Sequence, residues 1–235
     1  RDRLRSRGLG DVYKRQAPEH LEGKEPYLRS LQGFNITIPH KMAIIPIVDE
    51  LDESAKRYNS VNCVANQNGK LIGYNTDCDG FTMSVKEYPM DGKVLLIGCG
   101  GVGRMMAIET ALEGGDLTIA ALKSDAALAE EVVKEIKALK SDAKVQLAWI
   151  SGAALDKGDL PGGAQYDLLI NACPVGMFPK VDRMPCTPAV LDGVKFVFDA
   201  VYNPKVTLLS KTAREKGANC LLYTSPSPRD RSLSR

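Results

Sequence analysis

Residues 93–103 read Lys93-Val94-Leu95-Leu96-Ile97-Gly98-Cys99-Gly100-Gly101-Val102-Gly103, and this stretch decides the fold. The apolar run predicts a buried strand over 93–97, and a helix is expected over 102–113. Between them, the spacing Gly-x-Gly-x-x-Gly supplies a tight turn at Gly98, close backbone approach at Gly100 and close helix–strand packing at Gly103. In this setting the motif predicts a cradle for a dinucleotide pyrophosphate at a helix N-terminus. The alternative is a glycine-rich turn in an ordinary strand–helix unit.

Downstream of this loop, strand and helix patterns alternate as far as residue 219. Apolar runs predict further strands at 117–120, 145–148, 168–170 and 196–198. Helical spacing predicts a helix over 124–139 that Ser124 caps, and another over 208–215 that ends before Gly217. Repeated strand–helix units imply an α/β fold with a doubly wound parallel (Rossmann) sheet.

The end of the second strand bears on which cofactor the cradle takes. NAD-preferring loops carry an acidic residue there for the ribose 2′-hydroxyl, whereas NADP-preferring loops carry a basic one. Here no acid occurs after the strand until Asp125. Lys123 and Ser124 could meet a 2′-phosphate, which favours NADP. NAD is the alternative, in which case Lys123 is only a solvated loop lysine.

Upstream of residue 87 the pattern predicts a smaller α/β domain over 17–86. Phe34–Ile38 alternates apolar and polar residues, which predicts a strand with Asn35 and Thr37 on one face. Pro39 then opens a helix, so that Lys41 lies near the end of this strand. Other helices are expected at 25–31, 49–58 and 77–88.

A hairpin signal completes the small domain. Apolar segments at 61–65 and 70–74 flank Asn68-Gly69, and this pair supplies the positive φ angles of a tight turn. Asn62 lies on one arm, and Asp77 follows shortly after the other. Asn75 and Thr76 come directly after that second arm, and the helix expected from Asp77 leads to the next domain.

Both ends of the chain look foreign to the rest. Back-translating 6–16 gives a DNA segment whose reverse complement, read one frame over, encodes 220–230. The segment resembles a transposase-type sequencing adaptor. We therefore expect residues 1–16 and 220–235 to be non-native and the nucleotide-binding domain to span 87–219. The alternative is a basic N-terminal arm and a Ser/Pro-rich tail.

Composition excludes several classes of protein. With both ends set aside, acidic residues outnumber basic ones, so the net charge of +2 carries no hint of nucleic-acid binding. No apolar run approaches the ~20 residues that a membrane span needs. The 6 cysteines lack Cys-x-x-Cys spacing and only 2 histidines occur. That pattern argues against disulfides and against a metal site, and it is typical of the cytoplasm.

Taken together, these segments resemble the shikimate dehydrogenase family over 21–219. The strongest element is the pair Asn35-x-Thr37-x-Pro39-x-Lys41 and Asn75-Thr76-Asp77; the supporting segments are 33–41, 60–62, 75–77, 98–103, 171–177 and 199–204. The resemblance implies an enzyme of aromatic amino-acid biosynthesis, on the route to chorismate. Such an enzyme reversibly reduces 3-dehydroshikimate to shikimate with NADPH.

The resemblance also implies roles for individual residues. Lys41 and Asp77 match the catalytic pair, while Thr37, Asn62 and Tyr202 match positions near the substrate. Together with Lys123 and Ser124, the expected cofactor positions are Gly98, Gly100, Gly101, Val102, Gly103, Asn171, Val175 and Met177.

The chemistry of the Lys41/Asp77 pair agrees with this interpretation. Hydride arriving at a ketone carbon leaves negative charge on oxygen, which a lysine ammonium stabilises and can protonate. Asp77 would orient Lys41 and bind a substrate hydroxyl; which of the two transfers the proton stays open. The alternative is a surface salt bridge worth ~0–1 kcal/mol.

The chain also departs from the family pattern. Nothing upstream of Glu19 supplies the Ser-x-Ser that anchors the substrate carboxylate, no closing helix follows Ala218, and 121–123 lacks the usual Asn-Arg-Thr. We therefore expect an internal part of a longer enzyme, with a truncated substrate domain and weak or no turnover. The rival interpretations are an NAD-using quinate/shikimate dehydrogenase, a non-catalytic dinucleotide-binding module and a read fragment that does not fold. A homodimer is left open.

Overall fold

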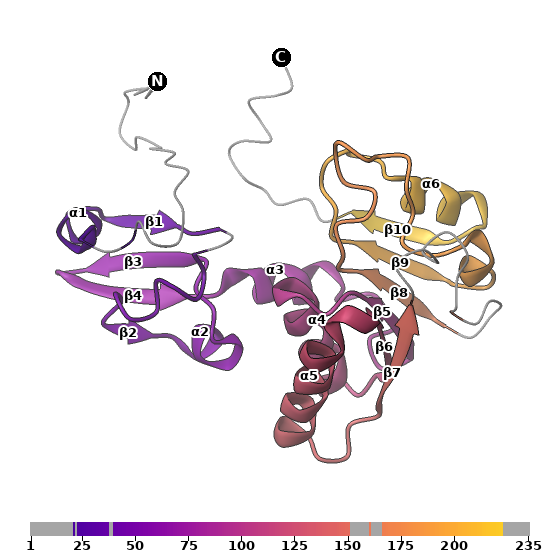
Figure 1. Ribbon diagram of the computed structural model, residues 1–235, viewed down its shortest axis with the longest axis horizontal. Coiled ribbons are helices and arrows are strands. Elements are labelled where there is room, and N and C mark those ends of the chain that lie inside the picture. The colour runs from indigo at the N-terminus through magenta and orange to yellow at the C-terminus, as the bar shows by residue number, and fades with distance from the viewer. Residues whose placement is uncertain (1–20, 22, 38–39, 151–159, 161–165, 223–235) are drawn as a thin grey trace. The chain divides into compact units, whose positions relative to one another are not determined.

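A computed structural model describes residues 21, 23–37, 40–150, 160 and 166–222 (Figure 1). The chain forms two compact units, residues 1–76 and 77–235, which divide earlier than the expected boundary after residue 86. Helix α3 (Thr76–Ser84) explains the difference, because its Cys78 and Phe81 side chains are buried. The ring of Phe81 meets the ring of Phe198 edge-on, with 5.2 Å between the centroids.

The second unit is built on a six-stranded sheet in the order β10-β9-β8-β5-β6-β7, and every neighbouring pair is parallel. Its strands are β5 (Lys93–Ile97), β6 (Asp116–Leu122), β7 (Val145–Ile150), β8 (Leu168–Asn171), β9 (Phe196–Asp199) and β10 (Asn219–Leu222). The expected doubly wound parallel sheet is confirmed. The chain runs outward from β5 through β6 to β7, then crosses to β8 on the other side of β5.

Helices cover this sheet because its strands are apolar on both faces. Helices α4 (Gly101–Leu112) and α5 (Ala126–Leu139) contact β5, β6 and β7, and α6 (Leu208–Glu215) contacts β9 and β10 (Figure 1). Leu95 and Leu96 are neighbours on β5 that point to opposite faces, and both are completely buried. A parallel sheet covered on both sides requires such continuous apolar strands.

One expectation in this unit is wrong, and the last strand extends beyond the expected end of the domain; that 220–235 are non-native stays a prediction. Ser124 does not cap α5, because a short 3-10 helix (Lys123–Asp125) intervenes and Asp125 occupies the N-cap position without a side-chain cap bond. Residues 220–222, expected to lie outside the domain, pair with β9 as part of the edge strand β10.

The first unit holds a four-stranded sheet in the order β1-β3-β4-β2. Its elements are α1 (Glu25–Arg29), β1 (Gly33–Asn35), β2 (Glu50–Leu51), α2 (Glu53–Tyr58), β3 (Cys63–Gln67) and β4 (Lys70–Tyr74). The hairpin is confirmed, since Asn68 and Gly69 at its tip take φ of 55° and 89°. A small core of Ile44, Ala55, Val61, Val64 and Leu71 lies under this sheet.

The segment before β2 differs from expectation. Ile38 and Pro39 lie outside the described residues, and 41–47 forms consecutive turns where a helix was predicted. The predicted helix at 49–58 begins only at Glu53, because residues 50–51 pair with β4 as β2. Asp52 then starts α2 by accepting a hydrogen bond from the Ser54 N–H at 2.8 Å.

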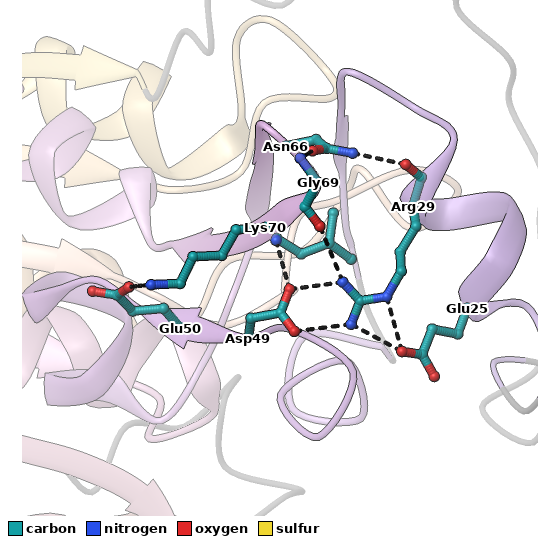
Figure 2. A network of polar contacts seen from close by, with 8 residues as sticks. Glu25, Arg29, Asp49, Glu50, Asn66, Gly69 and Lys70 are labelled. Atoms are coloured by element: carbon teal, nitrogen blue, oxygen red, sulfur yellow. Dashed lines mark hydrogen bonds and ion pairs between the residues drawn. The ribbon is translucent and has the colours of Figure 1, made fainter.

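An arginine ties α1 to the rest of the first unit (Figure 2). The Arg29 guanidinium donates to both carboxylate oxygens of Asp49, at 2.7 and 2.9 Å, and to Glu25 at 2.9 Å. Asp49 also accepts from the Leu71 N–H at 2.8 Å, and Asn66 donates to the Arg29 carbonyl at 2.7 Å. We call Glu25, Arg29, Asp49 and Asn66 the arginine clasp.

None of the helices in the described part of the chain combines the length and apolar character that crossing a bilayer requires.

Candidate active site

The glycine loop follows the central strand β5, at the carboxyl edge of the parallel sheet. Gly98 takes φ +101°, and a Cβ there would lie 3.1 Å from the Cys173 Cβ and 3.2 Å from the Ala172 carbonyl carbon. The Gly98 N–H donates to the Ala120 carbonyl at 2.9 Å, so the turn is fixed to β6. Only glycine suits this position, both for its left-handed conformation and for its close neighbours.

Gly103 brings α4 against this turn. A Cβ on Gly103 would lie 2.2 Å from the Gly98 carbonyl oxygen. By contrast, a Cβ on Gly100 or Gly101 would meet no atom within 4 Å, so the backbone there faces open space. Gly100 is the N-cap of α4, and because glycine has no side chain, the N-cap residue makes no side-chain bond to the first N–H groups of this helix. The loop therefore presents a helix N-terminus that an anion can approach.

This loop stands where the strand order reverses. β5 pairs with β6 on one side and with β8 on the other, and Ile97 lies opposite Asn171. The loops that leave β5 and β8 therefore start side by side, at residues 98 and 172. Ligands of open α/β sheets bind at such a switch point, beyond the carboxyl ends of the strands.

The end of β6 offers both signs of charge. Lys123 and Ser124 are exposed, and the Ser124 hydroxyl donates to the Asp125 carboxylate at 3.3 Å. Burial, with a smaller contribution from the Asp125 charge, raises the pKa of the Cys99 thiol in the glycine loop. The Asp125 carboxylate and the exposed Lys123 side chain therefore both follow β6 closely.

The loop after β8 carries three expected cofactor residues in different environments. Asn171 is completely buried, and its amide donates to Asp199 at 2.9 Å, so its side chain is occupied within the protein. Val175 is half-buried and Met177 is 38% exposed. Asn171 therefore shapes the loop through internal contacts, whereas Met177 lies on the surface.

Sequence reasoning missed the partner of Asn171. Asp199, the last residue of β9, is completely buried, and burial raises the pKa of its carboxyl against the opposing hydrogen bonds. Asp199 opens the segment 199–204 that supports the family resemblance, but the sequence assigned it no role. Tyr202 itself is 62% exposed on the following loop.

The first unit gathers the expected substrate residues through its backbone. The Val61 N–H donates to the Lys41 carbonyl at 2.9 Å, and the Ile36 N–H donates to the Asn62 carbonyl at 2.8 Å. The Asn62 side chain in turn accepts from the Thr76 N–H at 2.9 Å. These bonds bring the ends of three segments together.

The side chains in this group differ in exposure. Thr37 is exposed, while Lys41 and Asn62 are half-buried. The backbone bonds place Lys41 beside Val61 and Asn62 beside Ile36, the residue before Thr37, and the substrate roles of these residues stay predictions.

Asp77 follows Thr76 and occupies the first turn of α3, which belongs to the second unit. Lys41 and Asp77 therefore come from different units, and their pairing stays a prediction. Among the described residues, no group of three or more His, Cys, Asp or Glu side chains is arranged to hold a metal ion.

Comparisons with known proteins bear directly on this arrangement. Residues 6–64 match the model of the shikimate dehydrogenase substrate binding domain. The match includes 6–16, and the expectation that these residues are non-native stays a prediction. The shikimate dehydrogenase (NADP(+)) of Caldanaerobacter subterraneus subsp. tengcongensis is 37% identical over 209 residues, which cover 86% of this chain and 70% of that protein.

Solved structures agree with the sequence match. A shikimate dehydrogenase in complex with NADP+ superposes with a TM-score of 0.76 at 31% identity, covering 88% of this chain and 71% of that one. A quinate dehydrogenase from Corynebacterium glutamicum, in complex with NAD, gives a TM-score of 0.71 at 30% identity over 88% and 71% of the two chains. With these matches over most of its length, the chain belongs to the shikimate dehydrogenase family.

Proposed function

We propose that this chain is an NADP-dependent dehydrogenase that interconverts shikimate and 3-dehydroshikimate. The observation that carries the proposal is the glycine loop at the switch point of the sheet, in a chain whose relatives are named for this reaction. Gly98 and Gly103 close the loop sterically, while Gly100 and Gly101 leave room for a pyrophosphate.

The cofactor would be held by the second unit alone. The backbone of 98–103 would bind the pyrophosphate, Lys123 and Ser124 would meet the 2′-phosphate, and the loop after Asn171, with Val175 and Met177, would line the remainder. When bound, NADP would accept a hydride from shikimate or deliver one to 3-dehydroshikimate. These assignments fit the donors present, which are backbone N–H groups, an ammonium and a hydroxyl.

The proton would be handled by Lys41 and Asp77. During reduction, the Lys41 ammonium would donate a hydrogen bond to the ketone oxygen and stabilise the charge that develops there. Asp77 would hold Lys41 in place and accept a hydrogen bond from a substrate hydroxyl. Thr37, Asn62 and Tyr202 would bind the remaining hydroxyl groups, which would fix the orientation of the ring.

The test is oxidation of shikimate by the purified chain, followed by NADPH absorbance. Lys41→Ala should lower kcat by about 10²–10⁴-fold, because a positioned acid–base group is lost, and should leave NADP+ binding unchanged. We expect the unaltered chain to turn over slowly, and the same assay measures its rate. A Lys41→Ala protein as active as the unaltered chain would instead favour a non-catalytic dinucleotide-binding module.

A second candidate is an NAD-linked quinate/shikimate dehydrogenase. Asp125 favours it, since an acidic residue soon after β6 could bind a ribose 2′-hydroxyl, and its charge contributes to the raised pKa of the Cys99 thiol in the glycine loop. The structural resemblance to a quinate dehydrogenase in complex with NAD points the same way. Values of kcat/KM for both substrates with both cofactors distinguish the candidates, and we expect the shikimate/NADP pair to be preferred.

We also infer a cytoplasmic location, as the free cysteines would require a reducing compartment. The structure does not decide whether the chain forms a homodimer. Sedimentation of the purified chain with and without NADP+ measures its oligomeric state.

A further inference from the structure

A buried carboxylate lies behind the two loops that leave β8 and β9. Asp199 is completely buried and accepts hydrogen bonds from three donors. Its Oδ1 accepts from the Asn171 amide at 2.9 Å and from the Val201 N–H at 3.0 Å, and its Oδ2 accepts from the Thr207 hydroxyl at 2.5 Å. Bonds to a buried carboxylate are strong, and a donor left without one is costly.

Each of these donors controls a different piece of backbone. The Asn171 Oδ1 accepts from the Cys173 N–H at 3.2 Å, which turns the chain after β8. Val201 begins the loop after β9, next to Tyr202. Thr207 caps α6 together with Ser210, which ends that loop. Asp199 thus fixes the start of one loop and both ends of the other.

The two loops also hold each other. The Phe178 N–H donates to the Asn203 carbonyl at 3.0 Å, and the Ala200 N–H donates to the Asn171 carbonyl at 2.9 Å. A Cβ on Gly176 would lie 3.0 Å from the Arg183 carbonyl oxygen and 4.0 Å from the Thr207 Cβ, so this turn is tightly packed. A change at Asp199 would therefore affect residues 172–178 and 200–206 together.

We propose that Asp199 is a positioning residue, which sets the two loops carrying Val175, Met177 and Tyr202 in the conformation that binds the dinucleotide. The inference rests on the proposed function, because these loops would line the cofactor and substrate sites. Asp199 contacts neither cofactor nor substrate in this account. It acts through Asn171, Val201 and Thr207.

The key variants are Asp199→Leu and Asp199→Asn. Leucine has a similar size but no acceptor, so it leaves the Asn171 amide and the Val201 N–H buried without partners. Asparagine keeps one acceptor oxygen, which can still accept from the Asn171 amide and the Val201 N–H. The Thr207 hydroxyl can donate instead to the Ser210 hydroxyl oxygen, which lies 3.2 Å away. Ser210→Ala is the matched control, because it weakens the start of α6 and leaves the Asp199 contacts intact.

Two measurements on the full chain distinguish positioning from a general loss of structure. Calorimetric titration with NADP+ gives the dissociation constant and the binding-competent fraction separately, and hydrogen exchange maps the loops. We expect Asp199→Leu to raise the dissociation constant about tenfold, as expected when buried donors lose their acceptor, at an unchanged competent fraction. Exchange should rise in 172–178 and 200–206 only. Asp199→Asn and Ser210→Ala should stay near the unaltered chain.

Other outcomes would overturn the inference. A lower competent fraction at an unchanged dissociation constant, with faster exchange throughout the second unit, would mean that Asp199 only stabilises the fold. An equal loss in Ser210→Ala would assign the effect to the helix start. If the unaltered chain failed to bind NADP+, the proposed function would be contradicted. The exchange data would then decide separately whether Asp199 positions the loops.

If Asp199→Leu does not fold, the variants Thr207→Val and Thr207→Ser are compared in the same two measurements. Valine removes the hydroxyl that Asp199 accepts, and serine keeps it. Equal dissociation constants and equal loop exchange for these two variants would also overturn the inference.

Discussion

Glycines of one loop have different physical roles, although the sequence motif treats them alike. At Gly98 and Gly103 an added methyl group would collide with protein backbone, whereas at Gly100 and Gly101 it would enter open space. The first pair is therefore needed for folding of the strand–turn–helix unit. The second pair keeps the helix N-terminus accessible, and its role is tied to a ligand.

Gly103→Ala should destabilise the second unit. Its Cβ would lie 2.2 Å from the Gly98 carbonyl oxygen, and such overpacking costs about 1–3 kcal/mol. Urea unfolding of Gly103→Ala and Gly101→Ala measures the difference. Gly101→Ala should match or slightly exceed the unaltered chain in stability, because alanine favours a helix, yet it should weaken NADP+ binding. Equal stability of the two variants would contradict the packing role of Gly103.

A second prediction at this scale concerns Lys123. Lys123→Ala should weaken NADP+ binding by about tenfold, the loss expected for one charge-assisted contact, and should leave NAD+ binding unchanged. Lys144→Ala is the control. Lys144 is an exposed residue directly before β7, so it lies at the amino ends of the parallel strands, whereas Lys123 lies beyond their carboxyl ends. Calorimetry with both dinucleotides measures the effect. Unchanged NADP+ affinity in Lys123→Ala would remove this lysine from cofactor choice.

Roles that depend only on local spacing could be predicted from the sequence, and roles that depend on the sheet could not. The glycine motif is local, and the structure confirms its turn and its packing. Asn171 was predicted to line the cofactor groove, but its side chain bonds to Asp199, 28 residues further along the chain. Only the pairing of β8 with β9 brings these two residues together, and no spacing rule contains that information.

At the scale of elements, five of the six strands of the large sheet were predicted, because each contains an apolar run, and only the edge strand β10 was missed. The segment 41–47 was not, although it is also rich in apolar residues. Pro46 lacks an amide hydrogen and its ring would clash with the carbonyl of Met42 in a helix. The segment therefore forms turns that still bury Ile44.

We expect the arginine clasp to stabilise the small unit less as the pH falls. The Arg29 guanidinium, followed by the Leu71 N–H, lowers the pKa of Asp49 from 3.8 to about 2. A lowered pKa stabilises the fold fully above the unfolded value near 3.8, and the contribution is lost as pH falls through about 2. At pH 6, Asp49→Asn should therefore unfold at a lower urea concentration than the unaltered chain. The difference between the two urea midpoints should become smaller as the pH approaches 2.

Glu53→Gln provides the control for this prediction. Glu53 forms an exposed ion pair with Lys56, its neighbour on α2, at 2.7 Å. Such pairs contribute little, so this variant should follow the unaltered chain at every pH. If the difference in urea midpoint between Asp49→Asn and the unaltered chain did not change with pH, the clasp would act through packing and not through the Asp49 charge.

At the scale of the whole molecule, the proposed chemistry is divided between the two units. The second unit carries the cradle and Asp77, and the first carries Thr37, Lys41 and Asn62. Family membership explains why both sets occur in one chain, but each unit alone would be only a nucleotide binder or a small sheet with polar ends. The proposed dehydrogenase chemistry therefore requires that Lys41 and Asp77 act as one catalytic group.

A double-mutant cycle on kcat/KM for shikimate with NADP+ tests this most directly. Groups that act as a unit are strongly non-additive, since removing either one already removes the function. We predict that Lys41→Ala and Asp77→Ala each cause a large loss, and that the double variant is hardly slower than the worse single variant. Losses that multiply in the double variant, or a single variant with full activity, would contradict the account.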